Sequence, residues 1–155
     1  MDDATFIQLC TESTTTFYRV AFSILRKQQD AEDAVQQALM KGWTSRRRIW
    51  KGSEQAWMMR VVINECRNIQ RHRMRVSPIE HLPETPSGWP DMALRVAVDA
   101  LPDTLRLPLL LKYMESMSEK EIALALRLSV AAVKSRLHRA RQALRNELNE
   151  EVEWP

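Results

Sequence analysis

Several residue types and patterns are scarce in this sequence of 155 residues, and each scarcity excludes a class of structure. The chain has only 3 glycines, and aromatic residues make up 6% of it. No stretch alternates apolar and polar residues for long enough to predict a sheet. Because Leu, Ala, Arg, Glu and Gln dominate instead, the composition predicts an all-α fold.

The motifs of enzymes are also missing. The sequence has no glycine-rich phosphate loop and no nucleophile motif, so nothing in it supports an enzyme. Asp30 and Asp33 are close together, but they lie where the first turn of a helix is expected and where acidic residues stabilise it. The only cysteines, Cys10 and Cys66, have neither metal-ligand nor redox spacing, so we expect no metal and no other cofactor. We expect two buried free thiols in a reducing cytoplasm.

Signals for export and membrane insertion are missing as well. The N-terminus begins with two Asp after the first Met and lacks the basic start and apolar core of a signal peptide. No apolar run approaches the length that spans a membrane. We therefore expect a cytoplasmic protein without membrane insertion.

Charge is present but unevenly distributed. Residues 1–75 carry 13 Lys and Arg against 8 Asp and Glu, whereas residues 76–100 carry 1 against 4. Residues 101–155 carry 9 against 8. An acidic link therefore joins two parts with basic clusters, which favours a polyanion as partner. For any single cluster, a solvated surface remains an equally good interpretation.

Prolines divide the chain at the same place. Pro78, Pro83, Pro86 and Pro90 preclude a long helix between the two parts. We predict a first domain at residues 1–75, a flexible linker at 76–91 and a second domain at 92–155, both domains being small and helical.

Periodicity and capping signals predict the helices within each domain. In the first domain we expect helices at about 4–27, from a cap at Asp30 to about 42–45, and at about 54–74. In the second, we expect a helix after a cap at Asp91 and another at about 104–115, which Pro108 interrupts or starts. Two helices capped by Ser118 and Ser129 follow.

The last two of these helices have the clearest signals in the sequence. A short helix, a tight turn and a longer amphipathic helix is the layout of a helix-turn-helix. Val133, Leu137, Ala140 and Leu144 share the inner face of the second helix at about 100° per residue. The outer face and its edges are basic and rich in hydrogen-bond donors, as a helix in the major groove requires. Our candidate contacts to duplex DNA are Lys134, Ser135, Arg136, His138, Arg139 and Arg141. The alternative is a plain helical hairpin with a solvated face.

A second basic segment suits a single strand. Cations can follow phosphates while the ring of Trp50, which lies among them, stacks on a base. The alternative is a solvated loop with Trp50 packed on the core. Asn64 is a poor residue for a helix interior, so either a hydrogen-bonding role or exposure to solvent explains it. The full set of candidate contacts to single-stranded DNA comprises Arg46, Arg47, Arg48, Trp50, Lys51, Asn64, Arg67 and Arg71.

In two blocks, the sequence resembles the extracytoplasmic-function subgroup of the sigma-70 family of RNA polymerase sigma factors. The first block resembles region 2 of that family and comprises residues 30–43 (DAEDAVQQALMKGW), 56–64 (AWMMRVVIN) and 71–75 (RHRMR). The second resembles region 4 and comprises residues 101–103 (LPD), 117–123 (MSEKEIA) and 133–141 (VKSRLHRAR). In this order, around a proline-rich linker, the two blocks are highly specific.

The resemblance implies a division of labour. Region 2 would bind core RNA polymerase through the helix that carries Asp33, Gln36, Gln37 and Met40. The loop from Arg46 to Ser53, with Asn64, would hold a flipped base of the melted −10 element, and a preformed pocket would offset the cost of unstacking. Region 4 would read the duplex −35 element. Members of the subgroup are usually held inactive by an anti-sigma factor, so we expect one as a further partner.

Two rival interpretations remain at this point. A stand-alone helix-turn-helix transcriptional regulator would use residues 1–75 for dimerisation and bind its operator without polymerase. A recombinase or nuclease with a helix-turn-helix tail would need catalytic acidic, Ser or Tyr residues within residues 1–90, and no such group is visible.

Overall fold

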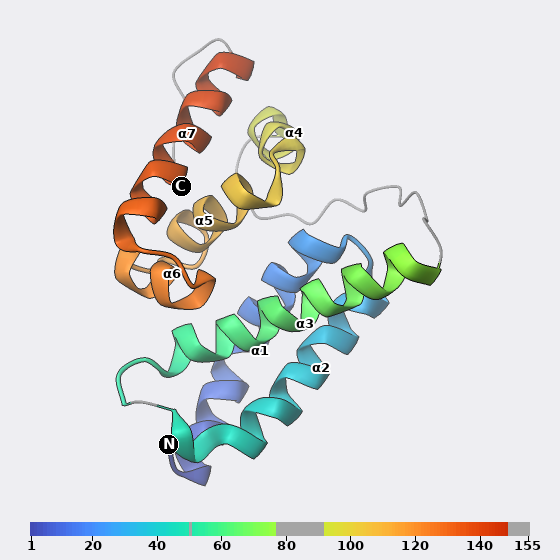
Figure 1. The fold of residues 1–155 in the computed structure, drawn as a ribbon, viewed down its shortest axis with the longest axis vertical. Coiled ribbons are helices and arrows are strands. Elements are labelled where there is room, and N and C mark those ends of the chain that lie inside the picture. Colours follow the sequence, from blue (N-terminus) through green and yellow to red (C-terminus); the bar gives the residue numbers. More distant parts are fainter. Residues whose placement is uncertain (50, 77–91, 149–155) are drawn as a thin grey trace. The chain divides into compact units, whose positions relative to one another are not determined.

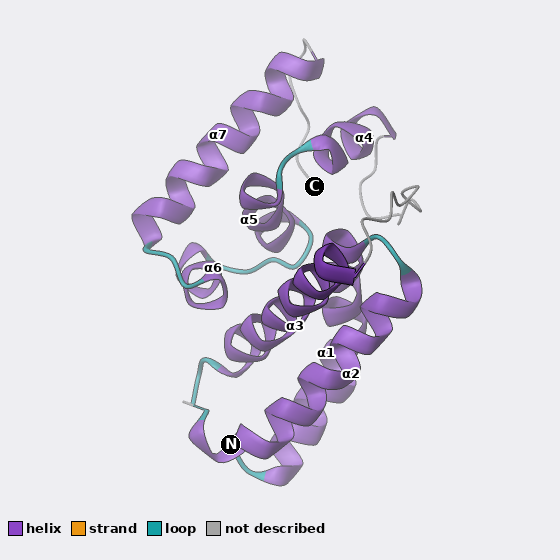
Figure 2. Ribbon diagram, turned by 45° about the vertical axis from the view of Figure 1, so that its right-hand side comes forward, coloured by secondary structure: helices purple, strands orange, loops and turns teal. Residues whose placement is uncertain are grey.

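The computed structural model describes residues 1–49, 51–76 and 92–148, and every regular element within these ranges is a helix (Figure 2). The predicted all-α fold is therefore confirmed. The chain divides into two compact units, residues 1–86 and 87–155. The candidate residue Trp50, most of the predicted linker and the predicted cap Asp91 lie outside the described residues. None of the described helices is both long and apolar enough to cross a membrane.

The first unit is built from three long helices that pack against one another (Figure 1). These are α1 (Asp3–Leu25), α2 (Gln28–Ser45) and α3 (Glu54–Val76), with a short 3-10 helix, η1 (Arg46–Arg48), after α2. α2 and α3 each bury one apolar face, as expected for amphipathic helices that form a common core, whereas the end of α1 from Val20 to Leu25 is buried on all sides. The largest fully buried side chains of this core are Phe17, Val20, Leu25, Met58, Met59, Val62 and Ile63.

The three helices approach one another closely at Gly42. A Cβ atom built on this residue would lie 2.5 Å from the Met58 sulfur on α3 and 3.2 Å from a ring carbon of Phe6 on α1. The end of the Met58 side chain would have to move to admit a side chain here, so glycine favours the close approach although it costs helix propensity. Two ion pairs also join α2 to α3, namely Lys41 with Glu65 and Asp30 with Arg73.

Two local predictions in this unit were wrong. Asp30 does not cap α2, because the chain reverses at Arg26, which has a φ of 59°, and α2 begins at Gln28 instead. Asp30 is left in the first turn, where it pairs with Arg73. Cys10 is half-buried rather than buried, since it lies on the partly exposed side of α1, whereas Cys66 is buried as predicted. Neither cysteine forms a disulfide.

The second unit contains α4 (Met92–Ala100), α5 (Asp103–Tyr113), α6 (Glu119–Leu126) and α7 (Val130–Leu148). The long helix α7 contacts each of the other three (Figure 1). Pro108 neither starts nor interrupts α5 but lies inside it, buried along with the leucines on either side. Burial of this leucine-rich helix therefore outweighs the lost backbone hydrogen bond.

Candidate nucleic-acid interface

Local capping contacts fix the geometry of the α6–α7 pair. The Ser118 hydroxyl accepts from the Glu121 N–H at 3.1 Å, and the Glu121 carboxylate accepts from the Ser118 N–H at 3.1 Å, so the predicted capping box is present. Arg127 ends α6 in the left-handed region with a φ of 57°. The Ser129 hydroxyl then accepts from the Ala132 N–H at 3.0 Å and caps α7. The turn between the helices is thus short and held at both ends.

The two faces of α7 differ as predicted. Val133, Leu137, Ala140 and Leu144 are buried, each at most 1% exposed. Because these residues hold α7 on the unit, the opposite face is presented to solvent along a regular helix. The candidate residues exposed there are Lys134, Ser135, His138 and Arg139. An exposed helix face that carries cations and hydrogen-bond donors can enter a major groove and contact both bases and phosphates.

Three basic residues of α7 differ in their exposure and in their contacts within the unit. The Lys134 ammonium lies 3.9 Å from the Glu119 carboxylate, and its side chain is 66% exposed, so this weak pair leaves it able to reach a phosphate. Arg136 is half-buried. Arg141 is engaged inside the unit: its Nε donates to the Tyr113 hydroxyl at 2.7 Å, and its guanidinium carbon lies 5.4 Å from the centre of the Tyr113 ring.

The predicted single-strand segment lies after α2 in the first unit. Arg47, Arg48 and Lys51 are exposed, and Ile49 between them is only 5% exposed. Gly52 has a φ of 92°, and its N–H donates to the Glu54 carboxylate at 2.9 Å, which turns the chain into α3. The cations therefore lie on a turn that a buried isoleucine anchors. Arg46 is the exception, because its side chain is bonded within the unit.

The remaining candidates of this segment lie on α3. Asn64 is half-buried, whereas Arg67 and Arg71 are exposed, and their spacing places all three on one side of the helix. The Arg71 guanidinium donates to the Asn68 side chain. Arg60, also half-buried, continues the same face toward the start of α3. Sequence reasoning missed Arg60 and Asn68, although their spacing from Asn64, Arg67 and Arg71 could have indicated them.

The residues that the resemblance assigns to polymerase binding lie on α2. Asp33, Gln36, Gln37 and Met40 are all exposed, and their spacing places them on one side of the helix. Met40 is 59% exposed and adds an apolar side chain to this otherwise polar face. This face therefore combines polar groups with an exposed apolar side chain, as protein-binding surfaces often do.

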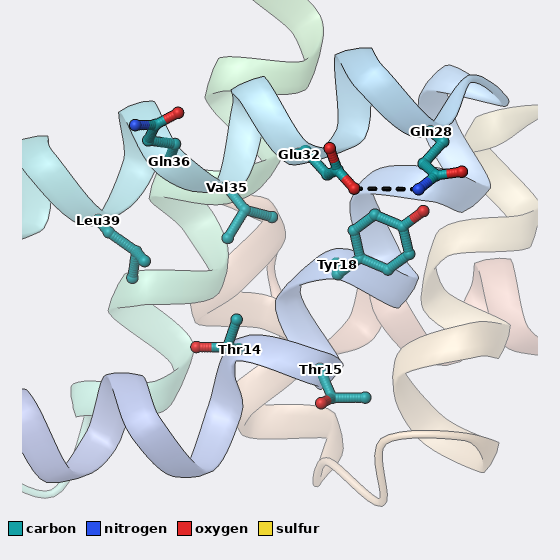
Figure 3. A pocket seen from close by; sticks show the side chains of 8 residues that line it. All are labelled: Thr14, Thr15, Tyr18, Gln28, Glu32, Val35, Gln36 and Leu39. Carbon is teal, nitrogen blue, oxygen red and sulfur yellow. Dashed lines mark hydrogen bonds between the residues drawn. The ribbon is translucent and has the colours of Figure 1, made fainter.

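A groove of about 530 Å³ borders this face and runs between α1 and α2 (Figure 3). Val35 and Leu39 point from α2 toward α1, and the Glu32 carboxylate at one end accepts from the Gln28 side chain at 3.1 Å. Sequence reasoning did not find this groove, because it depends on the packing of two helices. Its lining residues are Thr14, Thr15, Tyr18, Gln28, Glu32, Val35, Gln36 and Leu39.

Comparisons with known proteins identify both units. Residues 12–76 match the family described as Sigma-70 region 2, and residues 91–144 match Sigma-70, region 4. The chain is 37% identical over 131 residues to the RNA polymerase sigma-E factor of Streptomyces coelicolor, covering 77% of this chain and 72% of that protein. It is 30% identical over 156 residues to the ECF RNA polymerase sigma factor SigE of Mycolicibacterium smegmatis, covering 91% of this chain but only 60% of that protein.

A solved structure shares the fold. The sigma factor RpoE of Bartonella quintana, determined in complex with the anti-sigma factor NepR, matches with a TM-score of 0.76 and 24% identity, covering 96% of this chain and 99% of that one. A stand-alone regulator that uses residues 1–75 only for dimerisation is not favoured, because that segment matches region 2. The chain belongs to the sigma-70 family of RNA polymerase sigma factors, in its extracytoplasmic-function subgroup.

Proposed function

We propose that this protein is a sigma factor that binds core RNA polymerase in the cytoplasm and directs it to a subset of promoters, without enzymatic activity of its own. The observation that carries the proposal is the exposed donor-rich face of α7, held by four buried side chains and capped at its start. Family membership supplies the polymerase as partner.

Each unit has its own task in this proposal. In the second unit, Arg139 and His138 read base edges of the duplex −35 element, and Lys134 and Ser135 hold the phosphates beside them. The partly covered Arg136 contributes from the edge of the same helix.

In the first unit, the turn with Arg47, Arg48 and Lys51 follows the backbone of the melted −10 strand, and Trp50, which lies between them in the sequence, stacks on a base. Asn64 offers an amide that can bond a flipped base, and Arg67 and Arg71 continue a basic track along α3.

The α2 face with Asp33, Gln36, Gln37 and Met40 binds core polymerase. Its exposed apolar side chain and its carboxylate support this assignment, since an interface gains affinity from buried apolar area and register from charge. We further propose that an anti-sigma factor competes for the protein, because the structurally similar Bartonella quintana protein was solved with one.

Run-off transcription tests the proposal. Purified full-length protein, core polymerase and the promoter of its own operon should yield one specific transcript, and core alone should yield none. The full chain should also co-purify with core polymerase. Absence of both the transcript and the co-purification would refute the proposed function, whereas tight operator binding without polymerase would support a stand-alone regulator.

A further inference from the structure

Arg46 differs from the other cations of its segment in how it is held. Its Nε donates to the Asp3 carboxylate at 2.6 Å, and one of its terminal nitrogens donates to the Trp43 carbonyl at 2.7 Å. Its guanidinium carbon lies 3.6 Å from the centre of the Trp43 ring. The Arg46 side chain is accordingly only 16% exposed.

The same contacts join two distant parts of the first unit. Asp3 lies in the first turn of α1, and Arg46 begins η1 at the end of α2. The Trp43 ring also packs edge-on against Phe6 of α1, with ring centres 5.7 Å apart. Arg46 therefore links the start of the basic turn to α1 by its ion pair with Asp3, and to the end of α2 by a backbone hydrogen bond and a ring contact at Trp43.

The segment from Arg46 to Ile49 is thus fixed at both of its ends. Arg46 holds it at one end, and the buried Ile49 holds it three residues later. Arg47 and Arg48 lie between these two anchors and are exposed. A turn held in this way presents its cations without first losing conformational entropy on binding, which increases affinity.

We propose that Asp3 and Arg46 are positioning residues: their ion pair, stacked on Trp43, holds η1 so that Arg47 and Arg48 face the single-stranded DNA. Arg46 itself makes no phosphate contact. The inference rests on the proposed function of this segment, and it assigns a role to Asp3, an acidic residue on a different helix.

The two possible roles of Arg46 predict opposite effects of a substitution at Asp3 on the affinity for single-stranded DNA. If Asp3 only occupied Arg46, the substitution Asp3→Asn would release a cation and remove a negative charge, so binding of a polyanion would strengthen. If the pair positions the turn, the same substitution weakens binding although the net charge becomes more positive. Charge alone cannot produce this weakening.

The test uses holoenzyme reconstituted from core polymerase and the full chain. The probe is a fluorescein-labelled single strand that covers the non-template −10 region of its own operon promoter, and anisotropy is measured over a range of salt concentrations. We expect Asp3→Asn to weaken binding by about two- to fivefold, the range set by an exposed ion pair. Glu12→Gln, which removes an exposed carboxylate of α1 that accepts from Gln8, should leave binding unchanged.

A second substitution keeps the charge of the segment constant. Arg46→Lys retains a cation that can hold a phosphate but loses the planar group that stacks on Trp43 while bonding two partners. We expect it to weaken binding as Asp3→Asn does. In the double variant Asp3→Asn with Arg46→Lys, the two losses should not add, because each breaks the same link.

The salt dependence separates the outcomes further. The slope of log affinity against log salt should be no steeper in Asp3→Asn than in the unmodified protein. A slope steeper by about 0.7, as expected for one new phosphate contact to a single strand, would overturn the inference. Equal or tighter binding of Asp3→Asn, or full binding by Arg46→Lys, would also overturn it. Failure of the unmodified holoenzyme to bind the strand or to transcribe would instead refute the proposed function.

Discussion

Arg141 provides a sharp test of which cations on α7 reach DNA. Its Nε donates to the Tyr113 hydroxyl at 2.7 Å, and its guanidinium lies over the Tyr113 ring. Replacing Arg141 by Ala removes one charge-assisted hydrogen bond, worth about 1 kcal/mol at a half-buried site. It also removes a cation–π contact worth about 0.5 kcal/mol. We therefore expect Arg141→Ala to lower the free energy of unfolding of its unit by about 1–1.5 kcal/mol.

Arg141→Ala should not affect DNA binding in the way that it affects stability. Because Arg141 is engaged with Tyr113, its loss should leave the salt dependence of −35 binding unchanged. Lys134→Ala, at a side chain that is 66% exposed, should make the slope of log affinity against log salt shallower by about 0.9, the value for one phosphate contact to duplex DNA. The assay is anisotropy of holoenzyme on a labelled −35 duplex, with thermal unfolding of the free chain alongside.

Tyr113→Phe serves as the matched variant, since it keeps the ring and removes only the hydroxyl. It should lower the free energy of unfolding by about 1 kcal/mol, which corresponds to about 4–8 °C in the unfolding temperature of a unit of this size. The reasoning is refuted if Arg141→Ala leaves stability unchanged and lowers the salt slope as much as Lys134→Ala does.

Three further predictions concern other residues. Arg139→Ala should weaken binding to the −35 duplex by about 1–3 kcal/mol without changing the unfolding temperature, and unchanged binding would mean that the reading face is misassigned. Gly42→Ala should destabilise the first unit by about 0.5–2 kcal/mol in urea unfolding, since overpacking against Met58 exceeds the gain in helix propensity; a more stable variant would contradict this. Burial raises the pKa of the Cys10 thiol, so its alkylation at pH 8 should be slower than that of a free cysteine, though faster than that of the buried Cys66. Because the folded state holds the protonated thiol more strongly than the unfolded chain does, the free energy of unfolding should fall as the pH rises through the range in which the thiol titrates. Thermal unfolding of the unmodified protein and of Cys10→Ser over this pH range would detect the difference.

Local sequence patterns were sufficient for much of the fold. The spacing of Val133, Leu137, Ala140 and Leu144 predicted the buried face of α7, and the Ser118–Glu121 pair predicted a capping box that is present. These features depend on residues within a few positions of one another, where the geometry of a helix fixes the contact. The start of α2 was mispredicted because the left-handed Arg26 leaves no clear signal in the sequence.

The candidate site was less predictable, because its decisive contacts join distant residues. Asp3 and Arg46 are 43 positions apart, and Tyr113 and Arg141 are 28 apart. Periodicity assigns a residue to a face but does not state which side chain of another helix meets it there. The groove between α1 and α2 was missed for the same reason, since it exists only once the two helices have packed.

These long-range contacts change how a basic segment should be interpreted. By composition, Arg46 and Arg141 count the same as Arg47 and Lys134, and all four were candidates for DNA. In the structure, Arg46 and Arg141 each bond a partner in their own unit and lie against an aromatic ring, whereas Arg47 and Lys134 remain largely exposed. Breaking a made hydrogen bond and a ring contact would offset much of the gain from meeting a phosphate in water-exposed surroundings. Each segment therefore offers DNA fewer cations than its charge suggests.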